Sequence, residues 1–154
     1  MKVVIGADGA GFKLKAAIKE DLLKKGIEIF DVNPEAPILF YDAAKKVSKR
    51  VQSKEYDRGI VICGTGMGVS IIANKHKGVY AALVECEYTA RRSKVVNNTN
   101  VLCLGGMVLG EPMGVAIANS WLFANYMEGL DDDIKKIVKD EFNNLVEFEN
   151  EVYS

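Results

Sequence analysis

One cysteine and three alternating glycines stand together in residues 62–68, which read Ile-Cys-Gly-Thr-Gly-Met-Gly. The apolar run at residues 59–62 predicts a buried strand, and residues 67–76 predict a helix. Cys63 is therefore expected at the carboxyl end of a parallel strand, where open α/β sheets bind their ligands. Glycine lets the backbone come close to a bound oxygen, and amides at the start of a helix attract negative charge. A thiol in this position can exist as a thiolate and exchange a proton with a bound substrate.

Asp8 and the Asn-Asn-Thr-Asn cluster at residues 97–100 are the other polar groups that we expect at this edge of the sheet. Because the loops after parallel strands converge on one edge, these groups are expected to meet Cys63 there. Each also has a plainer explanation. A buried cysteine is usually an inert small hydrophobe, aspartate is favoured as a helix N-cap, and asparagine is common in ordinary turns. The surrounding glycines favour the functional interpretation for Cys63, and both explanations stay open for the other two.

The segment Gly6-Ala-Asp-Gly-Ala-Gly11 imitates the glycine fingerprint of dinucleotide-binding proteins. In that fingerprint the second glycine allows the pyrophosphate to approach the backbone. Asp8 stands at this position, and its charge would repel the phosphates. An acid here suits sugar hydroxyls better than a dinucleotide.

Strand and helix patterns alternate along the chain. Strands are expected at residues 2–7, 27–32, 58–63, 79–84 and 100–104, and helices at 12–25, 41–52, 67–76, 88–95 and 112–126. Such alternation predicts an α/β fold, with a doubly wound, five-stranded parallel sheet and helices on both faces. The expected domain therefore spans residues 1–126.

Residues 127–154 form an acidic C-terminal extension in which one more helix is expected, from residue 131 to about residue 149. Its apolar positions fall on one edge, and no later element of the chain follows that could cover them. We therefore expect this helix to contact another subunit.

Composition narrows the functional classes. With 20 basic and 21 acidic side chains the net charge is −1, so a nucleic acid partner is not expected. No apolar run is long enough for a membrane span or a signal peptide, so a cytoplasmic protein is expected. The three cysteines fit neither a disulfide framework nor a metal spacing, and a single histidine rules out a multi-histidine metal site.

Four segments together carry a resemblance to a known family. The chain resembles the family of ribose-5-phosphate isomerase B and galactose-6-phosphate isomerase in Asp8-Gly-Ala-Gly-Phe12, Ile62-Cys-Gly-Thr-Gly-Met-Gly-Val-Ser70, Ala73-Asn-Lys75 and Asn97-Asn-Thr-Asn-Val-Leu102, in this order. The resemblance implies a Rossmann-like five-stranded parallel sheet and dimers or tetramers with active sites between subunits. It also implies no cofactor, no metal, and the interconversion of small aldose and ketose phosphates.

The resemblance assigns roles to residues that could perform this chemistry. Cys63 would be the base that removes a proton beside the carbonyl, and Thr65 would hydrogen-bond its thiolate. Backbone amides along the glycine loop would stabilise the enediolate oxygen, each donor contributing about 3 kcal/mol in comparable sites. The loop residues concerned are Gly64, Gly66, Met67 and Gly68. Asp8, Gly9 and Asn97 would contact the substrate.

Several departures from the family pattern concern ring opening and phosphate binding. Val96 replaces the ring-opening histidine, Gly9 replaces another histidine, and Met107 replaces an arginine. Leu130 and Ile134 stand at the positions of two phosphate-binding arginines. Cations elsewhere, such as Arg91, Arg92 or Lys94, a second kind of subunit, or an altered substrate are the three ways to account for these losses.

Three functional classes therefore remain from the sequence. The first is an aldose–ketose isomerase that acts as a homodimer or homotetramer. The second is a subunit of a hetero-oligomeric isomerase, or a non-catalytic homologue that binds a sugar or a partner. The third is a thiol redox protein that uses Cys63, which is disfavoured because no Cys-x-x-Cys spacing supplies a resolving thiol.

Overall fold

Five parallel strands form the centre of the molecule in the computed structural model, which describes residues 1–154. Their order in the sheet is β2-β1-β3-β5-β4. The strands are β1 (Lys2–Ala7), β2 (Glu28–Asp31), β3 (Arg58–Cys63), β4 (Ala81–Leu83) and β5 (Val101–Gly105). This arrangement confirms the predicted α/β class and the parallel sheet.

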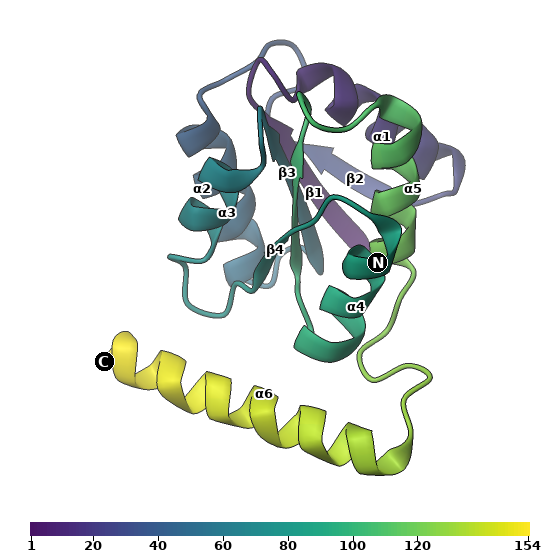
Figure 1. The fold of residues 1–154 in the computed structure, drawn as a ribbon. Coiled ribbons are helices and arrows are strands. Elements are labelled where there is room, and N and C mark those ends of the chain that lie inside the picture. The colour runs from purple at the N-terminus through teal and green to yellow at the C-terminus, as the bar shows by residue number, and fades with distance from the viewer.

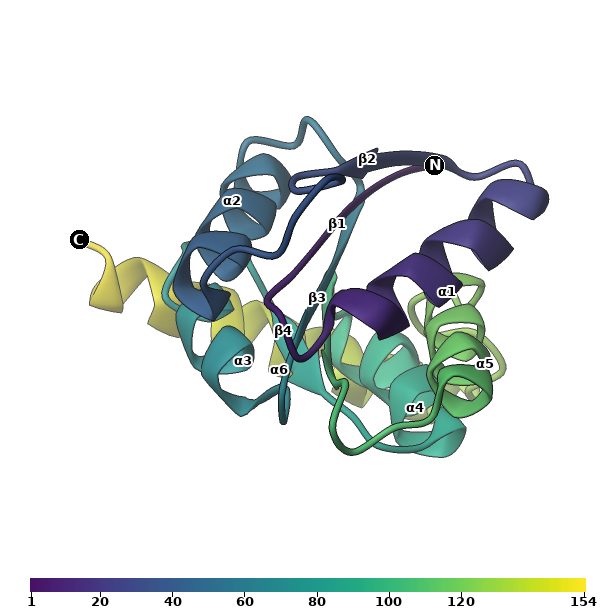
Figure 2. The same ribbon diagram turned by 90° about the horizontal axis from the view of Figure 1, so that it is seen from above.

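Helices cover both faces of the sheet. They are α1 (Phe12–Lys24), α2 (Phe40–Gln52), α3 (Met67–Ala73), α4 (Glu87–Asn97), α5 (Glu111–Leu122) and α6 (Asp132–Val152). Seen from above, α2 and α3 lie on one side of the strands, and α1, α4 and α5 lie on the other (Figure 2). Each layer has its own apolar core, because successive strand residues point to opposite faces.

The two ends of the parallel strands define two edges of the sheet. The carboxyl edge carries the loops that follow the strands, and the amino edge carries the loops that precede them. Helix α6 crosses the amino edge as a separate rod below the rest of the molecule (Figure 1). Phe142 anchors its middle between the rings of Tyr80 and Tyr126, at centroid distances of 5.3 and 5.6 Å.

All the predicted strands and helices are present, and some of their ends differ where distant residues intervene. Helix α5 ends at Leu122 and not at Tyr126. The Arg58 guanidinium donates to the carbonyl oxygens of Trp121, Leu122 and Ala124, and these bonds take the place of a further helical turn. Strand β4 and helix α3 are also shorter than predicted.

None of the six helices combines the length and the apolar character that a membrane span requires.

Candidate active site

Cys63 is the last residue of β3 and lies at the carboxyl edge, with 5% of its surface exposed. Its Sγ accepts a hydrogen bond of 3.1 Å from the backbone N–H of Gly66. Gly66 has a φ of 78°, in the left-handed region that a side chain disfavours. A Cβ at this residue would also overlap Leu83. Glycine at position 66 is therefore what allows the loop to turn an amide toward the thiol.

Three loops lock together around this thiol. The N–H of Gly106 donates to the Cys63 carbonyl at 2.8 Å, and the N–H of Met107 donates to the Gly64 carbonyl at 2.9 Å. On the other side, the N–H of Asp8 donates to the carbonyl of Ile62 at 3.1 Å. The loops after β1, β3 and β5 therefore hold one another in place.

Two glycines make this close approach possible. A Cβ on Gly105 would lie 2.8 Å from the backbone of Thr65, and one on Gly106 would overlap the carbonyl of Ala10. We call Gly66, Gly105 and Gly106 the glycine floor of the site. The sequence shows Gly105 and Gly106 side by side at the end of β5, but only the structure shows which loops approach them.

Amides of the loop after β3 are available to a ligand. The N–H groups of Gly64, Thr65 and Gly68 donate to no acceptor within the chain. A substrate oxygen placed near them would receive hydrogen bonds in a fixed geometry, the arrangement that stabilises a developing oxyanion.

Thr65 does not bond the thiol as predicted. Its Oγ1 accepts a hydrogen bond of 3.4 Å from the N–H of Met67, and Sγ is bonded by Gly66 instead. The left-handed turn at Gly66 brings that backbone amide to the sulfur. The catalytic role of Thr65 remains a prediction.

Asp8 follows β1 and is partly buried beside the glycine loop. One carboxylate oxygen, Oδ1, accepts the N–H of Gly11 at 3.0 Å, so the side chain does cap the start of α1. The other oxygen has no hydrogen-bond partner within the chain. Asp8 can therefore serve both as a cap and as an acceptor for a substrate hydroxyl.

Exposed apolar side chains lie along and beside the loop that follows Cys63. Phe40 is 44% exposed, Met67 55% and Met107 78%, and we call these three the apolar rim. Phe40 packs over Gly68, and the Met107 sulfur packs on Gly64. None of the five hollows in the molecular surface is lined by Cys63, Thr65 or Asp8. A single chain therefore forms no hollow beside the thiol.

Asn97 lies at the other edge of the sheet, so the expectation that it meets Cys63 within one chain is wrong. It is the last residue of α4, and the loop that it begins leads into β5. Loops that precede parallel strands run along the amino edge, opposite the ends of the strands. Its contact with the substrate remains a prediction that requires a second chain.

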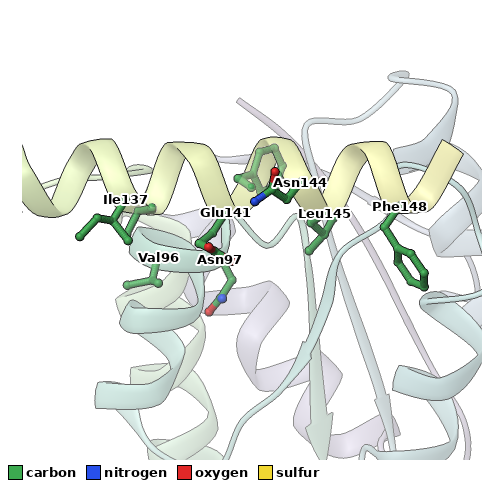
Figure 3. A pocket seen from close by; sticks show the side chains of 9 residues that line it. Val96, Asn97, Ile137, Glu141, Asn144, Leu145 and Phe148 are labelled. Carbon is green, nitrogen blue, oxygen red and sulfur yellow. The ribbon is translucent and has the colours of Figure 1, made fainter. Parts of the chain in front are cut away.

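A groove of about 620 Å³ separates α6 from the end of α4, and Asn97 forms part of its wall. Figure 3 shows Val96 and Asn97 facing side chains of α6 across this space. We call it the α6 groove. Its lining from α6 comprises Ile137, Val138, Glu141, Phe142, Asn144, Leu145 and Phe148. Ile137 and Phe148 are 58% and 65% exposed, so the groove presents apolar surface to the outside.

Two of the three candidate cations are engaged within the chain. Arg91 pairs with Glu128 at 3.2 Å, and Lys94 donates to Asn98 Oδ1 at 2.8 Å and to the carbonyl of Thr99 at 3.2 Å. Burial, reinforced by the nearby Arg58 charge, lowers the pKa of Lys94 to about 8. Arg92 is exposed.

The remaining thiols differ in their surroundings. Cys103 is fully buried, and burial raises its pKa well above the ordinary range. Cys86 is exposed, and hydrogen bonds with Thr89 lower its pKa. No group of three or more His, Cys, Asp or Glu side chains is placed to hold a metal ion.

Fold and site together define an α/β protein with a buried thiol beside a glycine loop at the carboxyl edge of a parallel sheet. The chain belongs to the Ribose/Galactose Isomerase family, whose model matches residues 3–139. It is accordingly an aldose–ketose isomerase.

Relatives agree with this assignment over most of their length. The chain is 38% identical to the 4-deoxy-4-sulfo-D-erythrose isomerase of Clostridium sp. (strain MSTE9), over 99% of this chain and 98% of that protein. It is 35% identical to the galactose-6-phosphate isomerase subunit LacA of Clostridium acetobutylicum, over 84% of this chain and 91% of that protein. The ribose-5-phosphate isomerase B of Clostridium thermocellum has a similar structure, with a TM-score of 0.89, 38% identity and full coverage of both chains.

Proposed function

We propose that Cys63 is the base of an isomerisation that passes through a cis-enediolate. The thiolate removes the proton from the carbon beside the carbonyl, and the electron pair of that C–H bond forms the enediolate double bond. The thiol then returns the proton to the neighbouring carbon, while the hydroxyl proton moves between the two enediolate oxygens. The observation that carries this proposal is the Gly66 N–H bond to Sγ beside three unoccupied amide donors.

The unpaired amides supply the electrostatic part of the mechanism. Gly64, Thr65 and Gly68 offer their N–H groups on the loop that starts at the thiol. Donors of this kind act on the oxygen where charge develops, and removal of one typically costs 100- to 1,000-fold in kcat.

We further propose that the site is completed by a second copy of the chain. No hollow encloses Cys63 in one chain, while Asn97 lines a groove at the opposite edge. Exposed apolar side chains occur at both places, in the apolar rim and on α6. A two-fold dimer in which each rim meets the other α6 groove would cover both surfaces and bring Asn97 of one chain toward Cys63 of the other.

The substrate proposed here is an open-chain sugar with an anionic group at its end. Opening a cyclic sugar needs an acid and a base at the ring oxygen and the anomeric hydroxyl. The only histidine, His76, bonds to the carbonyls at the end of α3, away from Cys63, and Val96 is apolar. A four-carbon aldose whose C4 carries no free hydroxyl cannot close a five-membered ring, so it needs no such catalysis. The substrate named for the Clostridium sp. (strain MSTE9) relative is of this kind.

Cys63→Ala tests the base. Loss of a general base typically costs 100- to 10,000-fold, so turnover of the best substrate should fall by at least 100-fold with unchanged circular dichroism. Cys86→Ser is the matched control, because that thiol is exposed and outside the loop. Near-full activity of Cys63→Ala would remove Cys63 from the mechanism.

A substrate panel tests the open-chain proposal. Erythrose 4-phosphate and 4-deoxy-4-sulfo-D-erythrose should give a kcat/KM at least about 100-fold above that of ribose 5-phosphate, a ratio that corresponds to roughly 3 kcal/mol. A preference for ribose 5-phosphate would show that ring opening is catalysed after all.

The second candidate is a catalytic subunit that needs a different partner chain. The relative from Clostridium acetobutylicum is named as a subunit, which supports this alternative. Mass measurement of the purified chain, with activity assayed at the same concentrations, separates the two. A monomer that is inactive alone favours the hetero-oligomer, and an active homodimer favours the first proposal.

A further inference from the structure

The side chain of Asn33 bonds the backbone of β1 at a place beyond the end of β2, beside the active-site loop. Strand β2 ends at Asp31, which is paired in register with Ile5, and β1 continues two residues further to Ala7. The side of Ala7 that faces β2 would therefore be left without partners. The Asn33 carboxamide fills this place: Ala7 N–H donates to Oδ1 at 3.2 Å, and Nδ2 donates to the Ala7 carbonyl at 2.8 Å.

This pairing fixes the residue immediately before Asp8. On the opposite side, the N–H of Asp8 is bonded to the Ile62 carbonyl of β3. The backbone that carries the Asp8 carboxylate is thus held from both sides, by β3 and by Asn33.

The same carboxamide also holds the loop that faces the site. Nδ2 of Asn33 donates a second hydrogen bond, of 2.9 Å, to the carbonyl of Ala36. The next residue, Pro37, lies 3.9 Å from the place where a Cβ on Gly9 would be. Asn33 therefore joins the end of β1 to the loop wall opposite Gly9.

A buried ion pair keeps Asn33 in this position. Lys15 Nζ donates to the Asn33 carbonyl at 2.6 Å and to Asp31 Oδ1 at 2.8 Å, and that oxygen also accepts the Asn33 N–H at 3.0 Å. Burial acts to raise the pKa of Asp31, yet hydrogen bonds from Lys15, the Asn33 amide and Lys19 hold it below its ordinary value. Asn33 itself is 6% exposed.

We propose that Asn33 is a positioning residue of the isomerase: it sets the place of Asp8 and of residues 34–37 where both meet the hydroxyl groups of the substrate. The inference rests on the proposed function of this site. Asn74 makes a similar pair of bonds to Ala81, but at the amino edge, so Asn33 alone does so beside the Cys63 loop.

A double-mutant cycle tests whether Asn33 acts through Asp8. Asn33→Ala should lower kcat/KM by at least 10-fold, mainly through KM, with an unchanged pH profile because Cys63 is untouched. In an Asp8→Ala background the same substitution should cost less than 3-fold, since the residue that it positions is gone. Asn33→Asp keeps the acceptor for Ala7 but places a carboxylate oxygen against the carbonyls of Ala7 and Ala36, so its loss should be at least as large as that of alanine. Asn33→Ser, which keeps a small polar side chain, serves if the alanine variant does not fold.

Asn119→Ala is the matched control for stability. The Asn119 carboxamide also makes three bonds, one to Val115 within α5 and two to Asp21 and Lys25, which link α5 to the end of α1 away from the site. Its substitution should lower the melting temperature to a similar extent and leave KM within 2-fold of the parent value.

Two results would overturn the inference. One is a pair of losses at Asn33 and Asp8 that multiply in the double variant. The other is a crystal structure of Asn33→Ala in which Asp8 and residues 34–37 keep their places. The structure decides the matter even for a protein inactive on every sugar tested, a result that would count against the proposed function itself.

Discussion

Substitution of Gly66 by alanine is expected to impair the Cys63 thiolate without removing any side chain from the site. Gly66 supplies the N–H that bonds Sγ at 3.1 Å, and its φ of 78° turns this amide inward. The added Cβ would overlap Leu83 and would lie 3.0 Å from the Leu104 backbone. The loop must shift to relieve this overlap, and the amide shifts with it.

Gly66→Ala should have two separate costs, one in folding free energy and one in catalytic rate. A non-glycine residue in the left-handed region costs about 1–2 kcal/mol of folding free energy. Loss of a hydrogen bond to a charged group costs about 1.5–3 kcal/mol, which corresponds to a decrease of roughly 10- to 150-fold in rate. The first term should appear in stability and the second in catalysis.

Gly26→Ala separates these terms. Gly26 has a φ of 75°, and nothing lies within 4 Å of a Cβ built there. Both variants should lose stability in urea unfolding, but only Gly66→Ala should lose kcat/KM. Alkylation by iodoacetamide in a Cys86→Ser background reports the Cys63 thiolate directly, and it should slow by a similar factor.

Leu83→Ala provides the internal check. Because Leu83 occupies the space that the new Cβ needs, the Gly66→Ala/Leu83→Ala double variant should recover part of the lost rate. Unchanged alkylation and unchanged kcat/KM in Gly66→Ala would refute the view that this amide stabilises the thiolate.

Four further substitutions test two perturbed pKa values, the α6 groove and the role of Thr65. Burial and the hydrogen bond to Glu149 raise the pKa of Tyr80 to about 12. The contribution of this contact to stability is therefore complete below pH 10 and is lost as the pH rises to 12. Tyr80→Phe should remove this pH dependence from the free energy of unfolding, measured in urea. The Lys94 pKa of about 8 lies below its unfolded value of 10.5. The free energy of unfolding should therefore rise by at most roughly 3 kcal/mol between pH 8 and pH 10.5. Lys94→Met should flatten this rise. Ile137→Glu places a charge in the α6 groove and should lower the sedimentation coefficient if α6 is a subunit contact; an unchanged oligomer would contradict that role. Thr65→Val should lower kcat by less than about 10-fold, because its hydroxyl bonds Met67 and not the thiol, and a loss as large as that of Cys63→Ala would contradict this.

Local patterns predicted the part of the site that lies within one strand–loop–helix unit. The apolar run and the glycines that follow it placed β3 at Arg58–Cys63 and the start of α3 at Met67, as observed. Periodicity and glycine stops are properties of neighbouring residues, so the sequence carries them directly.

Contacts between distant residues explain what was missed. The carbonyls at the end of α5 are bonded by Arg58, more than sixty residues earlier, and no helix signal near Leu122 marks this stop. The Asn33 carboxamide bonds Ala7 across 26 positions, and in the sequence it is only part of a loop.

The error at Asn97 had a different cause. The order helix, Asn97, strand was visible in the sequence, and a loop in this order belongs to the amino edge. Residues 97–100 lie next to a strand, but they come before it and not after it, so they belong to the amino edge.

The glycine floor also bears on how this enzyme can be redesigned. No side chain fits at Gly66, Gly105 or Gly106 without moving a neighbouring loop, so mutations there are expected to destroy the scaffold of the thiol before they alter selectivity. The apolar rim is the reverse case, because the side chain of Met107 is largely exposed while its backbone N–H stays bonded to Gly64. Libraries directed at the side chains of Met107 and Met67 therefore leave the glycine floor unchanged, but they also change the rim that is proposed to meet α6 of a second chain.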